Sequence, residues 1–134
     1  SRLGVNNIND ILPELIQKIN ENGLKVIWLC DPMHGNTFKN KYGYKTRHFN
    51  TILNELEQYM KIHRSLNTFP GGIHIEFTSE NVTECLGGFQ NINNDTLLKR
   101  YETACDPRLN NLQSLELIFK LTDLINEKGS QCQN

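Results

Sequence analysis

The sequence predicts an α/β fold built from parallel βαβ units. Helical patterns alternate with short apolar runs along the 134 residues, and this alternation is typical of parallel strands joined by helices. Only two strand-like runs are visible, at residues 24–29 and 73–78. Because two parallel strands cannot cover their own edges or both of their faces, we expect the chain to form part of a larger sheet. No linker divides the chain, so we expect residues 1–134 to belong to one domain without an internal boundary.

The first half of the chain contains a helix pattern followed by a strand pattern. Apolar residues recur at spacings of three and four between residues 6 and 22, which predicts an amphipathic helix. Asn9 or Asp10 is the expected N-terminal cap, and Gly23 is the expected end. The uniformly apolar run at residues 24–29 predicts a strand that is covered on both faces.

The remaining elements follow the same alternation. Residues 38–44 are polar and contain glycine, so we expect a loop there. Residues 46–66 carry the longest apolar stripe and predict a helix, which Pro70-Gly71-Gly72 separates from the alternating strand at 73–78. The last helix is expected at residues 111–127.

Composition and charge exclude several classes of partner. A formal net charge of -1 and an isoelectric point near 6.4 provide no basic surface for nucleic acid or for an anionic membrane. No apolar run approaches the ~18 residues that a membrane-spanning helix needs. The four cysteines are far apart in the sequence, which favours a reduced chain in the cytoplasm.

The residues best suited to chemistry follow the two strands. In α/β proteins of this connectivity, ligands bind beyond the carboxyl ends of the strands. Asp31 and His34 follow the first strand, Glu76 lies near the end of the second, and Asp106 precedes the last helix. One imidazole and two carboxylates from separate segments suit manganese, iron, cobalt or zinc better than calcium, which prefers oxygen ligands alone.

Each of these residues also has a structural interpretation. A histidine after a strand is commonly a hydrogen-bonded loop residue, and Asp106 in an Asp-Pro pair is typical of a turn or a helix cap. Glu76 would point inward if its neighbours face the helices, and an inward carboxylate requires either a function or a partner. The cluster Lys45-Thr46-Arg47 fits a solvated helix start or an anion site at a helix N-terminus.

Four motifs resemble the class II 3-deoxy-D-arabino-heptulosonate 7-phosphate (DAHP) synthases, the plant and microbial type of the first enzyme of the shikimate pathway. The motifs occur in the order found in the family and together cover essentially the whole chain. They are CDPMHGNT (residues 30–37), KTRHF (45–49), PGGIHIEFTSENVTECLGG (70–88) and YETACDPRLN (101–110).

The resemblance implies a (β/α)8 TIM barrel that condenses phosphoenolpyruvate with erythrose 4-phosphate and releases inorganic phosphate. It implies a divalent metal, manganese or cobalt, with His34, Glu76 and Asp106 as its ligands and as the catalytic residues. The arginine that holds the phosphate of phosphoenolpyruvate corresponds to Arg2, and Lys45 is a second candidate for substrate binding. Cys30 does not correspond to the metal-binding cysteine of the family, which lies far upstream.

The resemblance further implies that the chain is the C-terminal part of the barrel, from the end of strand six through helix eight. Its expected partners are the missing N-terminal half of the barrel, the two substrates and, when the protein is intact, further copies in a homo-oligomer. We expect little or no synthase activity from the isolated chain. The alternative is a non-catalytic metal-binding or assembly fragment. A plant source would place the protein in the plastid rather than in the cytoplasm.

Overall fold

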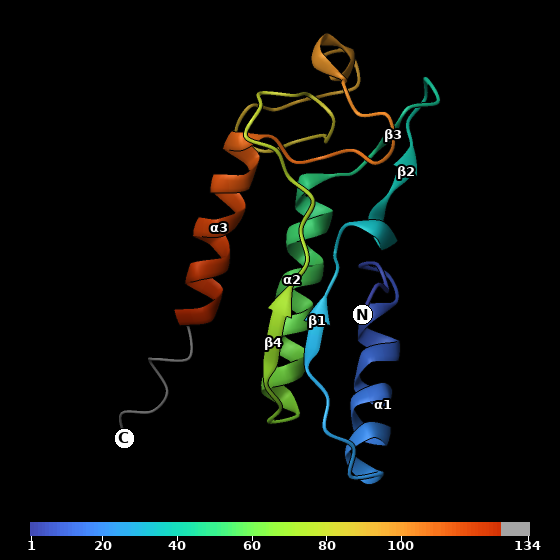
Figure 1. Ribbon diagram of the computed structural model, residues 1–134, viewed down its shortest axis with the longest axis vertical. Helices are drawn as coiled ribbons and strands as arrows, with labels where there is room; N and C mark the ends of the chain where they lie inside the picture. The colour runs from blue at the N-terminus through green and yellow to red at the C-terminus, as the bar shows by residue number, and fades with distance from the viewer. Residues whose placement is uncertain (127–134) are drawn as a thin grey trace. The chain divides into compact units, whose positions relative to one another are not determined.

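The computed structural model describes residues 1–126, which form two compact units. Unit 1 comprises residues 1–36 and 51–75, and unit 2 comprises residues 37–50 and those from 76 onward. Figure 1 shows the helices and strands of both units in a mixed α/β chain, as the sequence predicts. The two units are described separately below.

Unit 1 contains the predicted parallel βαβ arrangement. Strand β1 (Trp28–Cys30) pairs in parallel with strand β4 (Pro70–Ile73). The chain between them forms helix α2 (Phe49–Ser65), which lies behind the two strands in Figure 1 and belongs to unit 1 from residue 51 onward. The prediction of a crossover helix between parallel strands is therefore confirmed, although α2 begins three residues later than expected.

Strand β4 lies upstream of the predicted strand at residues 73–78, because the Pro-Gly-Gly segment belongs to the strand and does not merely precede it. A Cβ atom on Gly71 would stand 2.8 Å from the carbonyl oxygen of Trp28, and one on Gly72 would stand 2.9 Å from a methyl carbon of Leu29. At Gly71 the close atoms include the backbone of β1, so only glycine allows this approach, whereas the Leu29 methyl group near Gly72 can shift. Gly71, in a segment that resembles a turn in the sequence, is therefore required by the pairing of the strands.

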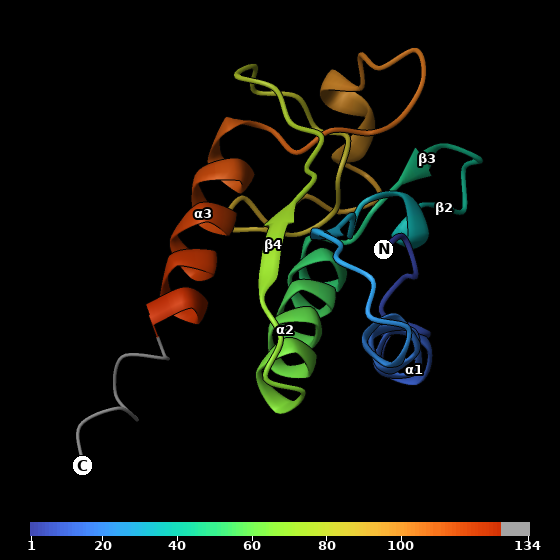
Figure 2. The same cartoon turned by 60° about the horizontal axis from the view of Figure 1, so that its bottom comes forward.

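Helix α1 (Ile8–Glu21) covers the predicted segment and packs its apolar stripe into unit 1. Ile8, Leu12 and Ile16 are fully buried. The prediction of Asn9 or Asp10 as the cap is wrong, because the helix already begins at Ile8, where Gly4 accepts backbone N–H groups of the first turn. Figure 2 shows α1 nearly along its axis.

Unit 2 contains few regular elements outside its C-terminal helix. Residues 38–44 are not simply a loop, because strand β2 (Phe38–Lys39) forms an antiparallel hairpin with strand β3 (Lys45–Thr46). Helix α3 (Asn111–Asn126) confirms the last predicted helix as far as residue 126, and the expected final residue, Glu127, lies outside the described residues. Two short 3-10 helices, at His34–Asn36 in unit 1 and Leu97–Arg100 in unit 2, complete the described elements.

The cysteines are unpaired wherever the structure describes them. Cys30 and Cys85 are buried free thiols and Cys105 is an exposed one, whereas Cys132 lies outside the described residues. No helix in residues 1–126 is long and apolar enough to cross a membrane.

Candidate functional site

Asp31 organises the chemistry-bearing residues of unit 1. Its side chain, at the end of β1, accepts a hydrogen bond from Arg2 Nε at 2.8 Å and contacts His34 Nδ1 at the same distance. The backbone N–H groups of Met33 and His34 donate to its other oxygen at 3.1 and 3.2 Å. Burial by itself would raise the pKa of Asp31, but the hydrogen bonds from His34, Met33 and Arg2 lower it to about 2. Asp31 is therefore a stable carboxylate that holds both the predicted phosphate-binding arginine and the predicted metal-binding histidine.

This arrangement orients both side chains. Because Asp31 engages Nδ1 of His34, Nε2 is the ring nitrogen that would coordinate a cation, as in carboxylate–histidine–metal arrangements. Because Arg2 donates to Asp31 from Nε, its two terminal nitrogens, Nη1 and Nη2, are the ones suited to a bidentate phosphate contact. The side chain of Arg2 is 63% exposed, so these groups are accessible from solvent.

A buried carboxylate, Glu55 of α2, supports the backbone segments that carry Arg2 and His34. Its side chain accepts the N–H of Gly4 at 3.1 Å and the side-chain amide of Asn36 at 2.5 Å. Asn36 in turn donates to the carbonyl oxygen of Pro32 and accepts the N–H of Val5. Burial raises the pKa of Glu55, and the hydrogen bonds from Asn36 and Gly4 oppose this rise.

Unit 1 also brings a second histidine close to this group. His74, which directly follows β4, has its ring centroid 6.1 Å from that of His34. One ligand atom each from Asp31, His34 and His74 lie within 4.8 Å of one another. Two imidazoles and a carboxylate form a donor set that suits a divalent transition metal, so the chemistry of unit 1 fits such an ion.

In unit 2, Glu76 is paired with a buried arginine. The Nη1 atom of Arg47 lies 2.7 Å from Glu76 Oε2, and the Arg47 side chain is completely buried. Arg47 also donates from Nη1 to the carbonyl oxygen of Pro107 and from Nε to Thr37 Oγ1 at 2.8 Å. The expectation that the Lys45-Thr46-Arg47 cluster is a solvated helix start or an anion site is wrong for Arg47, which is enclosed by its own chain.

Asp106 lies in a loop that is held from several sides within unit 2. Lys45 Nζ lies 3.1 Å from Asp106 Oδ1, so this lysine contacts a predicted metal ligand. The loop is fixed by Glu84, a buried carboxylate that accepts the N–H of Glu102 at 3.1 Å and of Arg108 at 2.8 Å. Asp106 is not a helix cap, since α3 begins only at residue 111.

The sequence located the polar strand ends, but it missed the buried groups that hold them. Arg47 and Glu84 lie within two of the family-like motifs, and Arg47 belongs to the ambiguous Lys45-Thr46-Arg47 cluster, but nothing in the sequence marks either residue as buried. Glu55 lies outside the motifs. The one available indication is position, because Glu55 falls between the buried residues Ile52 and Leu56 on α2. A charge within an apolar helix face indicates a buried partner or a function.

The surroundings of Cys30 are unfavourable for metal binding. Its thiol is fully buried at the end of β1, and burial, together with the nearby Glu55 carboxylate, raises its pKa to about 12. A thiol must ionise to become a good metal ligand, and this environment disfavours that ionisation. That Cys30 is not a ligand stays a prediction, which its burial supports.

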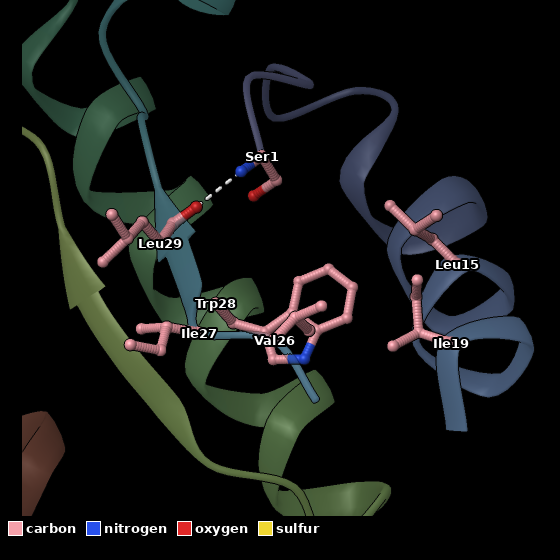
Figure 3. Close-up of a pocket in the computed structure, with 7 residues that line it drawn as sticks. All are labelled: Ser1, Leu15, Ile19, Val26, Ile27, Trp28 and Leu29. Atoms are coloured by element: carbon pink, nitrogen blue, oxygen red, sulfur yellow. Dashed lines mark hydrogen bonds between the residues drawn. The ribbon is translucent and has the colours of Figure 1, made fainter. Parts of the chain in front are cut away.

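Unit 1 also has a groove of about 320 Å³, which lacks this chemistry. It is lined by α1 and by the chain entering β1, and Figure 3 shows Leu15 and Ile19 pointing toward Val26 and Trp28. The polar side-chain groups among the drawn residues are the indole N–H of Trp28 and the hydroxyl of Ser1, and the backbone nitrogen of Ser1 donates to the carbonyl oxygen of Leu29 at 2.5 Å. The groove is suited to apolar packing and not to catalysis.

Comparison with known proteins gives one family. The sequence matches the class-II DAHP synthetase family over residues 1–122. It is 54% identical to phospho-2-dehydro-3-deoxyheptonate aldolase AroG of Mycolicibacterium smegmatis over 127 residues, and 49% identical over 127 residues to the enzyme of the same name from Streptomyces coelicolor. These alignments cover 95% of this chain but only 27% and 28% of those two proteins. A Streptomyces lividans protein of the same name is 46% identical, and 86% of its length is covered.

Proposed function

Because the chain belongs to the class-II DAHP synthetase family, we propose that it is the C-terminal part of a (β/α)8 catalytic domain that makes DAHP from phosphoenolpyruvate and erythrose 4-phosphate. In this proposal β1 and β4 are the seventh and eighth barrel strands, and residues 1–134 form one continuous segment of the domain. The observation that supports it most directly is that Asp31 holds the guanidinium group of Arg2 and the imidazole of His34 together.

The proposed reaction follows from the roles of these residues. Arg2 binds the phosphate of phosphoenolpyruvate through its planar fork, which a lysine would not reproduce. The C3 carbon of phosphoenolpyruvate forms the new carbon–carbon bond to the aldehyde carbon of erythrose 4-phosphate. Water adds at C2, and cleavage of the carbon–oxygen bond then releases inorganic phosphate. Lys45 is a further candidate for substrate binding.

Members of this family are generally metal-dependent, and the donor chemistry of the chain fits a divalent ion. We propose His34, Glu76 and Asp106 as the ligands that this chain supplies, and manganese or cobalt as the metal. The bound metal would supply Lewis-acid polarisation of the aldehyde oxygen. Asp31 supports this role by fixing the tautomer and orientation of His34.

The chain spans about a quarter of the length of the first two relatives, so we propose that it requires the rest of the barrel for activity. Large apolar side chains that a complete barrel would cover are exposed. Ile27, which precedes β1, is 81% exposed, and Phe119 of α3 is 69% exposed. We expect the chain on its own to self-associate or aggregate.

Complementation tests this function. Phosphate release from both substrates with manganese should be negligible for the chain alone. It should rise when the chain is joined to the N-terminal portion of the Mycolicibacterium smegmatis relative. His34→Ala and Glu76→Ala should abolish the activity of this hybrid, whereas His48→Ala, at an exposed position, should preserve it. A hybrid that stays inactive, or one that His34→Ala does not affect, would contradict the proposal.

The second candidate function is metal binding or assembly without catalysis. It is favoured by one observation: the Asp31, His34 and His74 donor group lies entirely within unit 1. Titration with cobalt of the wild type, His34→Ala and Glu76→Ala separates the two cases. Tight metal binding together with an inactive hybrid would favour this second function.

A further inference from the structure

Arg47 is the most deeply enclosed charged side chain in the described part of unit 2, with no exposed surface. Burying a guanidinium group is costly unless its donors are satisfied and its charge is paired. The proposed reaction assigns Arg47 no role, and the sequence placed it in a solvated or anion-binding cluster. Its contacts therefore require a separate explanation.

These contacts join the two segments of unit 2 that carry carboxylates. The guanidinium group pairs with Glu76 at 2.7 Å and donates to the carbonyl oxygen of Pro107, the residue directly after Asp106. Its Nε donates a hydrogen bond to Thr37 Oγ1 at 2.8 Å, and this bond orients the plane of the guanidinium group. One side chain thus contacts a proposed metal ligand and the neighbouring residue of a second one.

The backbone around Arg47 is fixed independently of this guanidinium group. Leu86 donates its N–H to the carbonyl oxygen of Arg47 at 2.8 Å, and its own carbonyl oxygen accepts the N–H of Phe49 at 2.8 Å. The neighbouring Thr46 hydroxyl donates to the carbonyl oxygen of Glu84 at 2.8 Å. The guanidinium group therefore extends from a rigid base, as a positioning group must.

The two carboxylate segments are also adjacent through their backbones. Leu109 donates its N–H to the carbonyl oxygen of Glu76 at 3.1 Å and accepts the N–H of Thr78 at 2.9 Å. This bridge fixes the backbones but leaves the Glu76 side chain able to rotate. The ion pair with Arg47 restrains that rotation, because Oε2 is held 2.7 Å from a buried nitrogen.

We propose that Arg47 is a positioning residue for the metal centre: it fixes the Glu76 carboxylate and the Pro107 carbonyl so that Glu76 and Asp106 are presented together. This inference rests on the proposed function, in which Glu76 and Asp106 are metal ligands. Nη1 makes the contacts to both Glu76 and Pro107, and Nε donates to Thr37; lysine offers a single nitrogen and would lose the Thr37 contact that orients the group.

Cobalt binding to the hybrid of this chain with the N-terminal portion of the Mycolicibacterium smegmatis relative tests this role. Dissociation constants come from competition with a chelator, and the visible spectrum at saturating cobalt reports the geometry of the ligands. Removing such a supporting contact typically weakens metal affinity about 10- to 100-fold, and we expect Arg47→Lys to fall in this range with a changed spectrum. A purely structural role would lower the urea midpoint but leave the spectrum of the folded protein unchanged.

Arg100→Lys is the matched control. Arg100 is an exposed arginine of unit 2 that pairs with Glu80 and Glu102. This variant should bind cobalt as the wild type does and give the same spectrum. An equal loss of affinity in Arg100→Lys and Arg47→Lys would overturn the inference, because the effect would then be one of general charge.

Thr37→Val keeps the test decisive if Arg47→Lys does not fold. It removes only the hydroxyl that orients the guanidinium group, and we expect a smaller loss of affinity with a change of spectrum in the same direction. Unchanged affinity and spectrum in whichever of these variants folds would overturn the positioning role alone. A wild type that binds no cobalt would instead contradict the metal centre in the proposed function, and the inference with it.

Discussion

Each compact unit contains a charged side chain with no exposed surface that holds neighbouring segments together, Glu55 in unit 1 and Arg47 in unit 2, and the two charges have opposite signs. In unit 1, Glu55 accepts hydrogen bonds from the backbone of Gly4 and the side chain of Asn36. In unit 2, Arg47 pairs with Glu76 and donates to the carbonyl oxygen of Pro107. Both residues are completely shielded from solvent.

The difference lies in what each buried charge contacts. Glu55 contacts the segments that carry Arg2 and His34 but neither of those side chains, whose direct partner is Asp31. Arg47 contacts the side chain of a proposed ligand itself. In unit 1, Glu55 supports the backbone segments and Asp31 orients the side chains. In unit 2, the guanidinium group of Arg47 does both. Loss of Arg47 should consequently have wider effects than loss of Glu55.

The largest expected effect is that of Arg47→Met on stability. Removing one partner of a buried ion pair leaves the other without its counter-charge, and we expect the free energy of unfolding to fall by about 3 kcal/mol. Urea denaturation followed by circular dichroism measures this loss. Arg100→Met, at an exposed ion pair, should cause a much smaller loss, because solvent screens that pair. Equal losses in the two variants would contradict the conclusion that the buried ion pair of Arg47 stabilises unit 2 more than the exposed ion pair of Arg100.

A smaller loss is expected for Glu55→Gln. The glutamine keeps one oxygen that can accept a hydrogen bond from Gly4 or Asn36, but it presents its amide NH2 group to the other donor. Removing a buried charge offsets part of this cost. We expect the free energy of unfolding to fall by about 1 kcal/mol. The same urea experiment on Glu14→Gln, an exposed position on α1, should show no loss. A loss for Glu55→Gln as large as that for Arg47→Met would contradict the comparison.

The smallest expected effect concerns acid and Asp31. The pKa of its carboxyl is about 2 in the folded chain, below the ordinary value of 3.8, so the unfolded chain binds more protons between these values. The stability that Asp31 contributes is thus complete above pH 3.8 and is lost as the pH falls toward 2. The difference in stability between wild type and Asp31→Asn should therefore shrink as the pH falls below 4. A difference that does not depend on pH would show that the charge of Asp31 is not what stabilises unit 1.

Much of the fold and the polar strand ends follow from local pattern. Apolar spacing located α1, α2 and α3 to within a few residues at their ends, because each helix buries one stripe. The order of elements predicted that the two strands of unit 1 run parallel, which their pairing confirms. The residues at the strand ends were recognised from their chemistry together with the family motifs, and their proposed roles remain predictions.

Only the tertiary structure decided where strand β4 lies and which charges are buried. Pro70-Gly71-Gly72 resembles a turn, yet it forms the strand because β1 approaches too closely for a Cβ atom. Arg47 resembles a solvated helix start, yet it is enclosed because Glu76 and Pro107, 29 and 60 residues further along the chain, supply its partners. Local sequence determines which side chains are available and which helices form. Contacts between distant segments determine where two strands lie so close that glycine is required, and whether a buried charged side chain is paired with one of opposite charge.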